Sequence, residues 1–170
     1  MLQPSNQMRS FMNASTKLFE TKSDSTVIDR LSTAVGMEFS ASSQYTVHAA
    51  LLKALGFNKL AAKEESESKE EIGHANRFLS RVLSSGNKFE YSSIPEITIG
   101  STLNEILSAD LKGEQAAIAY YSESVRICKE ANDDESAALF ANILEDEKQH
   151  EKFLKEQLAL LDTKGESAFK

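Results

Sequence analysis

Two short stretches of the chain repeat the same pair of metal-binding residue types. In EEIGHANRFL, Glu71 precedes His74 by three positions, and in EDEKQHEKFL, Glu147 precedes His150 by three. Three residues of an α-helix turn through about 300° and rise about 4.5 Å, so both members of a pair project from one face. One Glu-x-x-His pair is weak evidence for a metal site. Two of the chain's three histidines share this spacing, which favours a common role.

The two pairs belong to an internal repeat with an offset of 76 positions. This offset relates Glu71 to Glu147 and His74 to His150, and it also relates Glu38 to Glu114. Core-type positions obey it as well: Leu31 with Leu107, Val35 with Leu111, Ala41 with Ala117, and Tyr45 with Tyr121. The pattern predicts two helical hairpins of one design, each contributing a glutamate and then a Glu-x-x-His pair.

Glu38 and Glu114 lie on helical faces that are otherwise mostly apolar. A carboxylate on such a face is costly unless it is paired or bound to a cation. Two carboxylates about 4 Å apart repel each other by roughly 4 kcal/mol at an effective dielectric constant of about 20. An ion pair with Lys or Arg, or a solvated edge, would explain any one of these glutamates. Six residues in matched register favour a metal site instead.

The types of the candidate ligands indicate which metal suits them. Four carboxylates and two imidazoles carry four negative charges, which two divalent cations neutralise. Structural zinc sites prefer Cys and His, and calcium and magnesium rarely recruit imidazole, so iron or manganese fits best. Two Fe(II) ions can give one electron each to dioxygen or peroxide. The predicted ligands of two irons per chain are Glu38, Glu71, His74, Glu114, Glu147 and His150.

Four long helices must position these residues. Apolar residues recur with helical period in four segments, at about 25–55, 58–85, 101–131 and 134–162. Gly56 and Gly86 are natural helix ends, Asn58 is a natural start, and Thr102 and Glu105 have capping-box spacing. The segment 87–100 contains Pro95 and reads as an extended connection.

These elements predict an all-α fold. Two short turns and one long crossover between helices two and three are the connectivity of a ferritin-like four-helix bundle. The bundle would occupy 25–162, after an N-terminal extension at 1–24 and before a short C-terminal tail at 163–170. We expect the extension to pack against another part of the protein.

Composition excludes several classes of protein. The chain has 170 residues, a formal net charge of −7 and no cluster of Lys and Arg, which argues against a nucleic-acid partner. No apolar stretch approaches the length of a membrane span. Cys128 is the only cysteine, so we expect no disulfide framework and a reducing, cytoplasmic location.

Over about residues 25–162 the chain resembles bacterioferritin. Its six candidate ligands are similar to the ferroxidase centre of that family, in which the residues matching Glu71 and Glu147 bridge two irons. The resemblance implies that Glu38 and Glu114 are terminal ligands and that the two histidines complete the two sites. Tyr45 matches a family tyrosine close to the centre, although it reads equally well as a core aromatic. A hollow homo-oligomeric cage is implied in the same way; a 24-mer, a smaller shell and a dimer all remain open.

The sequence also departs from that family. Bacterioferritins bind haem between subunits through a methionine that directly follows the helix-two glutamate, and here this residue is Ile72. An isoleucine cannot ligate iron, so we expect no haem of that type. Ser66 replaces an iron-relay histidine, Phe153 replaces a tryptophan, and the tail is too short for the family's fifth helix.

Other residues near the candidate ligands have simpler interpretations. The acidic run 63–71 is typical of a solvated face, although in a cage Glu64, Glu67 and Glu70 could instead lead iron inward. His48 lies off the ligand face, which predicts a structural or exposed residue. Three glycines lie inside predicted helices beside ligands, and close helix approach is the simplest reason for them: Gly36, Gly73 and Gly113.

The leading functional hypothesis is a ferroxidase that oxidises Fe(II) with O2 or H2O2 and stores it as ferric mineral. One alternative is a diiron protein that removes peroxide without storing iron, which the lack of a Cys-x-x-Cys electron-transfer module argues against. A metal-free helical scaffold is the other.

Overall fold

The structure, a computed structural model, describes residues 25–90 and 95–170. The predicted N-terminal extension lies outside these residues, so the expectation that it packs on the protein is not addressed. The described residues form four long helices and one short 3-10 helix: α2 (Ser25–Ala54), α3 (Asn58–Ser84), α4 (Leu103–Glu130), α5 (Asp134–Lys164) and η1 (Glu166–Phe169). They contain no β-strand, and the all-α prediction is confirmed.

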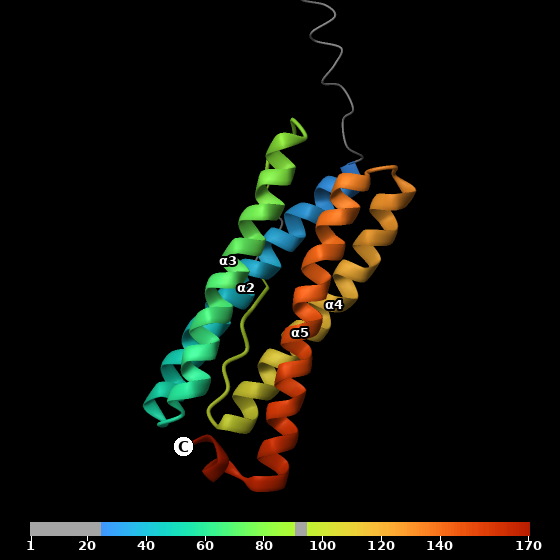
Figure 1. The fold of residues 1–170 in the computed structure, drawn as a ribbon. Helices are drawn as coiled ribbons and strands as arrows, with labels where there is room; N and C mark the ends of the chain where they lie inside the picture. Colours follow the sequence, from blue (N-terminus) through green and yellow to red (C-terminus); the bar gives the residue numbers. More distant parts are fainter. Residues whose placement is uncertain (1–24, 91–94) are drawn as a thin grey trace, which may run out of the picture.

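The helices form two antiparallel hairpins joined by a crossover along the length of the bundle (Figure 1). α2 packs mainly on α3, and α4 packs mainly on α5. Because the crossover returns from the end of α3 to the opposite end of the bundle, α4 runs in the same direction as α3. This is the predicted four-helix connectivity, with the long connection between the second and third long helices.

The described part of the crossover is tied to one stripe of α2. Polar side chains at four-residue intervals on that helix bond its backbone: Ser40 Oγ donates to the carbonyl of Pro95 (2.8 Å), Gln44 Oε1 accepts from the amide of Thr98 (2.8 Å), and His48 Nε2 accepts from the amide of Gly100 (3.1 Å). Since residues four apart share a helical face, a single stripe holds the extended chain in place.

Side chains cap the two helices of the second hairpin. The Thr102 hydroxyl accepts from the amide of Glu105 at 3.2 Å, and the Glu105 carboxylate accepts from the amide of Thr102 at 3.2 Å, so the predicted capping box forms. Asp133 caps α5 by accepting from the amide of Ser136 at 2.9 Å. Each cap supplies an acceptor to a helix-terminal amide that lacks one.

Glycines end the helices of the first hairpin. Gly56 and Gly86 have φ of +88° and +76°, a backbone conformation that favours glycine. The predicted start at Asn58 is correct for α3, but its N-cap is Phe57, which makes no side-chain capping bond. Phe57 is only 2% exposed, so burial of its ring positions this end of the helix.

The core is divided into two apolar clusters. One contains buried residues from the start of α2, the end of α3, the end of α4 and the start of α5, including Val35, Phe78 and Phe140. The other contains the opposite ends of the same helices, including Leu52 and Leu154. On every helix the candidate ligands lie between the two clusters. The bundle therefore holds a polar layer in its middle, enclosed by apolar packing at both ends.

After Gly165 the chain forms only the short helix η1. There the Phe169 ring packs edge-on against Phe57, with ring centroids 6.5 Å apart. None of the helices in the described ranges is long and apolar enough to cross a membrane.

Candidate metal centre

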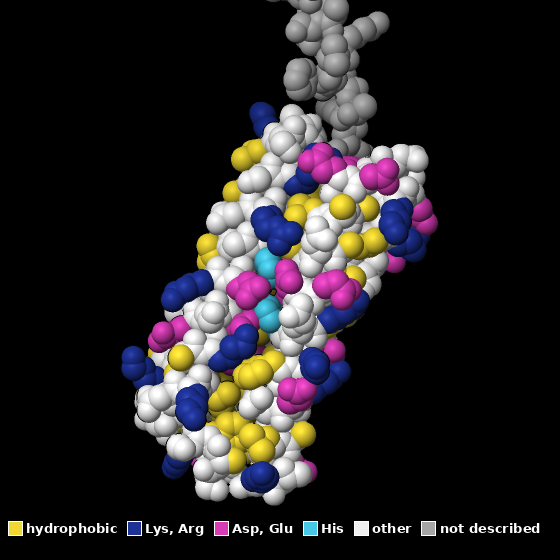
Figure 2. Space-filling view, in the orientation of Figure 1, with side chains coloured by type: hydrophobic (Ala, Val, Ile, Leu, Met, Phe, Trp, Pro, Cys, Tyr) yellow, Lys and Arg dark blue, Asp and Glu magenta, His cyan; other side chains and the backbone are white. Residues whose placement is uncertain are grey.

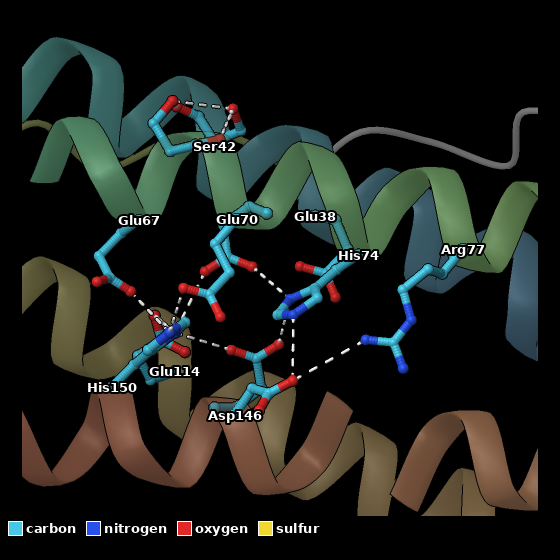
Figure 3. Close-up of polar contacts among 12 residues, drawn as sticks. Glu38, Ser42, Glu67, Glu70, His74, Arg77, Glu114, Asp146 and His150 are labelled. Carbon is cyan, nitrogen blue, oxygen red and sulfur yellow. Dashed lines mark hydrogen bonds and ion pairs between the residues drawn. The ribbon is translucent and has the colours of Figure 1, made fainter. Parts of the chain in front are cut away.

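All six predicted ligands lie buried in the polar layer of the bundle (Figure 3). Glu38 comes from α2 and Glu114 from α4, while α3 and α5 each contribute one Glu-x-x-His pair. Their exposed fractions are 2% for Glu38, 1% for Glu71, 3% for His74, 4% for Glu114, 1% for Glu147 and 6% for His150. The structure thus brings together four carboxylates and two imidazoles with almost no access to bulk water.

The six residues form two overlapping groups of four. Glu38, Glu71, His74 and Glu147 make one group, and Glu71, Glu114, Glu147 and His150 make the other. Within each group, one potential ligand atom per residue lies within 4.8 Å of the others. Glu71 and Glu147 belong to both groups, which is the position required of carboxylates that bridge two ions.

Each histidine presents its Nδ1 atom to the two shared glutamates. His74 Nδ1 is 2.9 Å from Glu71 Oε2 and 3.3 Å from Glu147 Oε1. His150 Nδ1 is 3.1 Å from Glu147 Oε2 and 3.3 Å from Glu71 Oε1. The two rings lie with centroids 6.5 Å apart and an interplanar angle of 24°. The arrangement follows the approximate twofold relation of the sequence repeat.

Several atoms in this centre lie near an oppositely charged group but make no hydrogen bond of acceptable geometry with the described residues. They are both carboxylate oxygens of Glu147, Oε1 of Glu71 and Nδ1 of His150. Buried polar atoms are nearly always satisfied, and unsatisfied ones cost about 1–3 kcal/mol each. Atoms of these types, directed at the same space, fit a pair of bound cations.

Burial and mutual repulsion perturb the two unshared carboxyl groups. Burial, together with the charges of Glu71 and Glu147, raises the pKa of Glu38 well above its ordinary value. Burial also raises the pKa of Glu114 to about 8, although the nearby imidazole of His150 acts in the opposite direction. Without metal, these two groups therefore hold protons near neutral pH.

The histidines also hold protons when no metal is bound. Burial alone would lower the pKa of His74, but the nearby carboxylates of Glu147 and Glu71 raise it to about 10. In the same way, burial would lower the pKa of His150, but Glu114, Glu147 and Glu71 raise it to about 12. These protons occupy the positions that cations would take, so metal binding must release them.

Comparison with known proteins shows the family to which this chain belongs. The model of the ferritin-like domain family matches residues 28–163. The chain belongs to the ferritin-like family. It is 39% identical to bacterioferritin of Brucella melitensis over 148 residues, covering 87% of this chain and 92% of that protein. It is 33% identical to bacterioferritin BfrA of Mycobacterium tuberculosis over 146 residues, covering 86% and 92%.

A solved bacterioferritin structure has the same fold. The structure of Rhodobacter capsulatus bacterioferritin superimposes with a TM-score of 0.81 at 36% identity, covering 84% of this chain and 89% of that one. That structure is described as having a metal-free dinuclear site and haem iron in a crystallographic special position. The resemblance to bacterioferritin, inferred from spacing and motifs, is confirmed at the level of the family.

Two tyrosines hold the unshared glutamates of this candidate centre. Tyr45 donates to Glu114 Oε1, and Tyr121 donates to Glu38 Oε1 at 2.6 Å. Burial raises the pKa of both phenols well above the ordinary value, so both remain donors at neutral pH. Sequence reasoning named Tyr45 but placed Tyr121 only in the core, although the 76-residue offset relates the two.

The prediction of a solvated acidic face is wrong for two residues of the run 63–71. Glu64 and Glu67 are 1% and 3% exposed, whereas the side chain of Glu70 is 44% exposed. Positions 64, 67 and 71 follow the helical period, so the first two lie on the same inward face as the ligand Glu71. The helical period could have identified both buried residues, whereas the local charge density indicated a solvated face.

Carboxylates also contact the outer nitrogen of each histidine. His150 Nε2 is 2.6 Å from Glu67 Oε2 and 3.7 Å from Glu70 Oε2. His74 Nε2 is 3.4 Å from Asp146 Oδ2. Figure 3 shows Glu67 extending from α3 to His150, and Asp146 extending from α5 to His74. A carboxylate at this position orients an imidazole ligand and selects its tautomer.

The third histidine, His48, is structural. It is fully buried, its Nδ1 is 2.8 Å from Asp110 Oδ1, and its Nε2 accepts from the amide of Gly100. Because the amide can only donate, Nε2 must be unprotonated and Nδ1 carries the proton. His48 therefore lacks a free nitrogen for a metal, even though Asp110 and Glu64 lie close by.

A cavity of about 420 Å³ adjoins the centre. Its walls come from all four long helices and the crossover, and include Glu38, Tyr45, Thr98, Asp110 and Glu114. It is large enough for small ions and for dioxygen or peroxide. On another face, histidine side chains are visible among acidic ones where α3 and α5 meet (Figure 2).

The expectation about haem depends on Ile72. This residue is 40% exposed and directly follows the shared Glu71 on α3. Its side chain has no atom that ligates iron, so the absence of haem stays a prediction.

Proposed function

We propose that the chain is a ferroxidase and iron-storage protein that oxidises Fe(II) to Fe(III) at a pair of metal positions within one subunit. The observation that carries this proposal is the sharing of Glu71 and Glu147 between two buried groups of ligands. The bacterioferritin relatives support the same conclusion. Both substrates, Fe(II) and the oxidant, are small enough for the adjoining cavity.

In this proposal each residue has a distinct role. Glu71 and Glu147 would be shared by the two ions, Glu38 and His74 would complete one position, and Glu114 and His150 would complete the other. Tyr45 and Tyr121 hold the unshared carboxylates by donating hydrogen bonds. The four carboxylates balance the charge of two divalent cations, which offsets the repulsion that the glutamates would otherwise experience.

The reaction balances without another cofactor. Two Fe(II) ions lose one electron each. Dioxygen takes up the two electrons and two protons to give H2O2, or H2O2 takes up the same number to give two molecules of water. Glu38 and Glu114 have raised pKa values and release protons when Fe(II) binds. The protein contributes placement, charge and access, while the redox chemistry belongs to iron.

We also propose that the chain assembles into a hollow homo-oligomer in the cytoplasm, where the oxidised iron is stored. Large apolar side chains remain at the surface of the single chain, with exposed fractions of 38–56%: Leu55, Ile72, Leu83, Ile97 and Ile99. Where such side chains form one patch they are commonly covered by association of subunits, so these positions are the first candidates for subunit contacts.

Rapid mixing tests the ferroxidase activity. Two Fe(II) ions per chain are added anaerobically to the metal-free protein, and oxidation is followed after addition of O2 or H2O2. We expect a fast phase that Glu71→Ala and His150→Ala abolish and that Glu65→Ala, on the exposed face of the same helix as Glu71, leaves intact. Wild-type rates in both ligand variants would reject the site.

Storage is tested separately. Light scattering gives the size of the assembled particle, and repeated additions of Fe(II) measure how much ferric iron remains soluble with it. A particle too small to enclose a cavity would reject storage but leave the ferroxidase proposal standing.

A further inference from the structure

The two hairpins supply matched ligands but unmatched supporting residues. The 76-residue offset relates Glu70 to Asp146, so the acidic residue directly before each shared glutamate is repeated. The same offset relates Lys63 to Leu139 and Glu67 to Ile143, so a basic and an acidic residue on α3 have apolar counterparts on α5. The surroundings of the two metal positions therefore differ in charge although their ligands do not.

On the His150 side, the supporting carboxylate is close and buried. Glu67 Oε2 is 2.6 Å from His150 Nε2, and the Glu67 side chain is only 4% exposed. Its other oxygen pairs with the ammonium group of Lys63, one turn earlier on α3. The Lys63 Nζ lies 5.3 Å from the ring centroid of Phe153, itself one turn beyond His150 on α5. A continuous chain of contacts runs from Lys63 through Glu67 to the ligand.

On the His74 side, the corresponding contacts are longer and more exposed. Asp146 Oδ2 is 3.4 Å from His74 Nε2, and the Asp146 side chain is 34% exposed. Arg77 approaches Asp146 only to 4.0 Å and is 43% exposed (Figure 3). Exposed ion pairs of this kind contribute little because water competes for both partners.

We propose that Lys63 is a positioning residue, which holds Glu67 against Nε2 of His150 so that the Glu114–His150 position binds a divalent cation more tightly than the Glu38–His74 position. A carboxylate held against the outer nitrogen of an imidazole fixes the ring orientation and tautomer and makes the ligating nitrogen a better donor. This inference rests on the proposed function, because it requires that the two groups of ligands bind metal.

Lys63 is necessary because Glu67 is buried. A buried carboxylate without a cation is costly, so without Lys63 the side chain of Glu67 is expected to turn toward water and leave Nε2. Glu70, at 3.7 Å from His150 Nε2, is the nearest other acidic group and lies beyond hydrogen-bond distance.

Anaerobic titration with Co(II), which reports binding through its visible absorption and undergoes no ferroxidase reaction, tests the inference on the full chain. Glu38→Ala leaves the Glu114–His150 position, and Glu114→Ala leaves the Glu38–His74 position. Lys63→Met, which keeps the apolar stem but not the charge, is placed in each background. The control is Lys59→Met. Lys59 lies one turn before Lys63 on α3, and both lysines line a pocket of about 280 Å³.

In the Glu38→Ala background, Lys63→Met is expected to weaken Co(II) binding about threefold to tenfold. Glu67→Gln, which replaces the contacting carboxylate itself, is expected to weaken it about tenfold to hundredfold. Lys63→Arg should restore most of the affinity. In the Glu114→Ala background, Lys63→Met should change the affinity by less than about twofold, as should Lys59→Met in either background.

Two results would overturn the inference: an unchanged affinity in the Glu38→Ala background, or equal weakening in both. Circular dichroism and thermal melting of each variant show whether the bundle is intact, and Lys63→Gln, which also lacks the charge, replaces Lys63→Met if that variant fails to fold. If the wild-type chain binds no Co(II) at two equivalents, the proposed metal centre is rejected. If it binds two ions and Lys63→Met changes neither affinity, only the inference about Lys63 is rejected.

Discussion

The phenol oxygen of Tyr121 on α4 lies 2.6 Å from Oε1 of Glu38 on α2. The repeat provides the counterpart, in which Tyr45 on α2 donates to Glu114 on α4. Each tyrosine thus crosses from its own hairpin to hold the unshared glutamate of the other. These two bonds join the hairpins through the polar layer and set the orientation of the carboxylates before any metal arrives.

Replacing Tyr121 with phenylalanine should destabilise the metal-free protein. Glu38 Oε1 would lose its donor in a site that is 2% exposed, which costs about 1–3 kcal/mol. Urea unfolding measures the change. Tyr120→Phe is the matched control, because Tyr120 is half-buried and its hydroxyl donates to the Arg30 carbonyl over a longer distance of 3.4 Å. Equal losses in the two variants would contradict the role of the Tyr121 bond.

Glu64 should make the stability of the metal-free protein depend on pH. Burial, with the charges of Asp110 and Glu114, raises the pKa of Glu64 to about 9. The folded chain therefore keeps a proton that the unfolded chain loses near its ordinary value of 4.5. Because the folded state binds more protons across this range, stability must fall as pH rises from about 4.5 to about 9.

The variant Glu64→Gln separates this effect from other titrations. The amide is neutral at every pH and can still donate to Asp110, so the variant should lose less stability than wild type between pH 6 and pH 9. Urea midpoints at the two pH values measure the difference, with Glu65→Gln as the exposed neighbouring control. If Glu64→Gln loses as much as wild type, Glu64 is not the group responsible.

Two glycines should respond in opposite directions to alanine. A Cβ at Gly100 would lie 2.6 Å from the backbone carbon of Glu105 and closer still to the amide of Ile106. Gly100→Ala should therefore cost about 1–3 kcal/mol and disturb the bond to His48. A Cβ at Gly73 would meet nothing within 4 Å, so Gly73→Ala should raise stability by about 0.5–1 kcal/mol.

Thermal melting of the two variants decides this prediction. The sequence-based prediction that another helix approaches closely at Gly73 is wrong. Gly73 lies inside α3, and a Cβ built there would have open space around it. At Gly113 the nearest atom is Gln44 Nε2 at 4.0 Å, an ordinary contact. A melting temperature lowered by Gly73→Ala would contradict the open space seen there.

Haem binding should require a change at one position. Haemin added to the wild-type protein should give no Soret spectrum of methionine-ligated iron, because Ile72 offers no ligand atom. Ile72→Met should produce such a spectrum if the subunits associate as the resemblance to bacterioferritin implies. The variant Ile72→Leu is the control for a change of shape without a sulfur atom. A Soret band in the purified wild-type protein would contradict the prediction.

Much of the fold and of the candidate centre could be predicted from the sequence because these features depend on local periodicity. Helix bounds follow from apolar period, from glycines such as Gly56, and from the Thr102–Glu105 capping box, each of which involves neighbours in the chain. The spacing of Glu71 and His74 fixes a shared helical face, and the 76-residue offset relates one hairpin to the other.

The tertiary structure decided what depends on residues distant in the chain. Whether Glu67 faces solvent or His150 depends on how α5 packs against α3, and the local charge density of 63–71 indicates the wrong answer. The donor to Glu38 lies 83 positions away at Tyr121, and the tautomer of His48 depends on the amide of Gly100 in the crossover. Local sequence sets which face a side chain occupies, but only the packing of the four helices sets what that face meets.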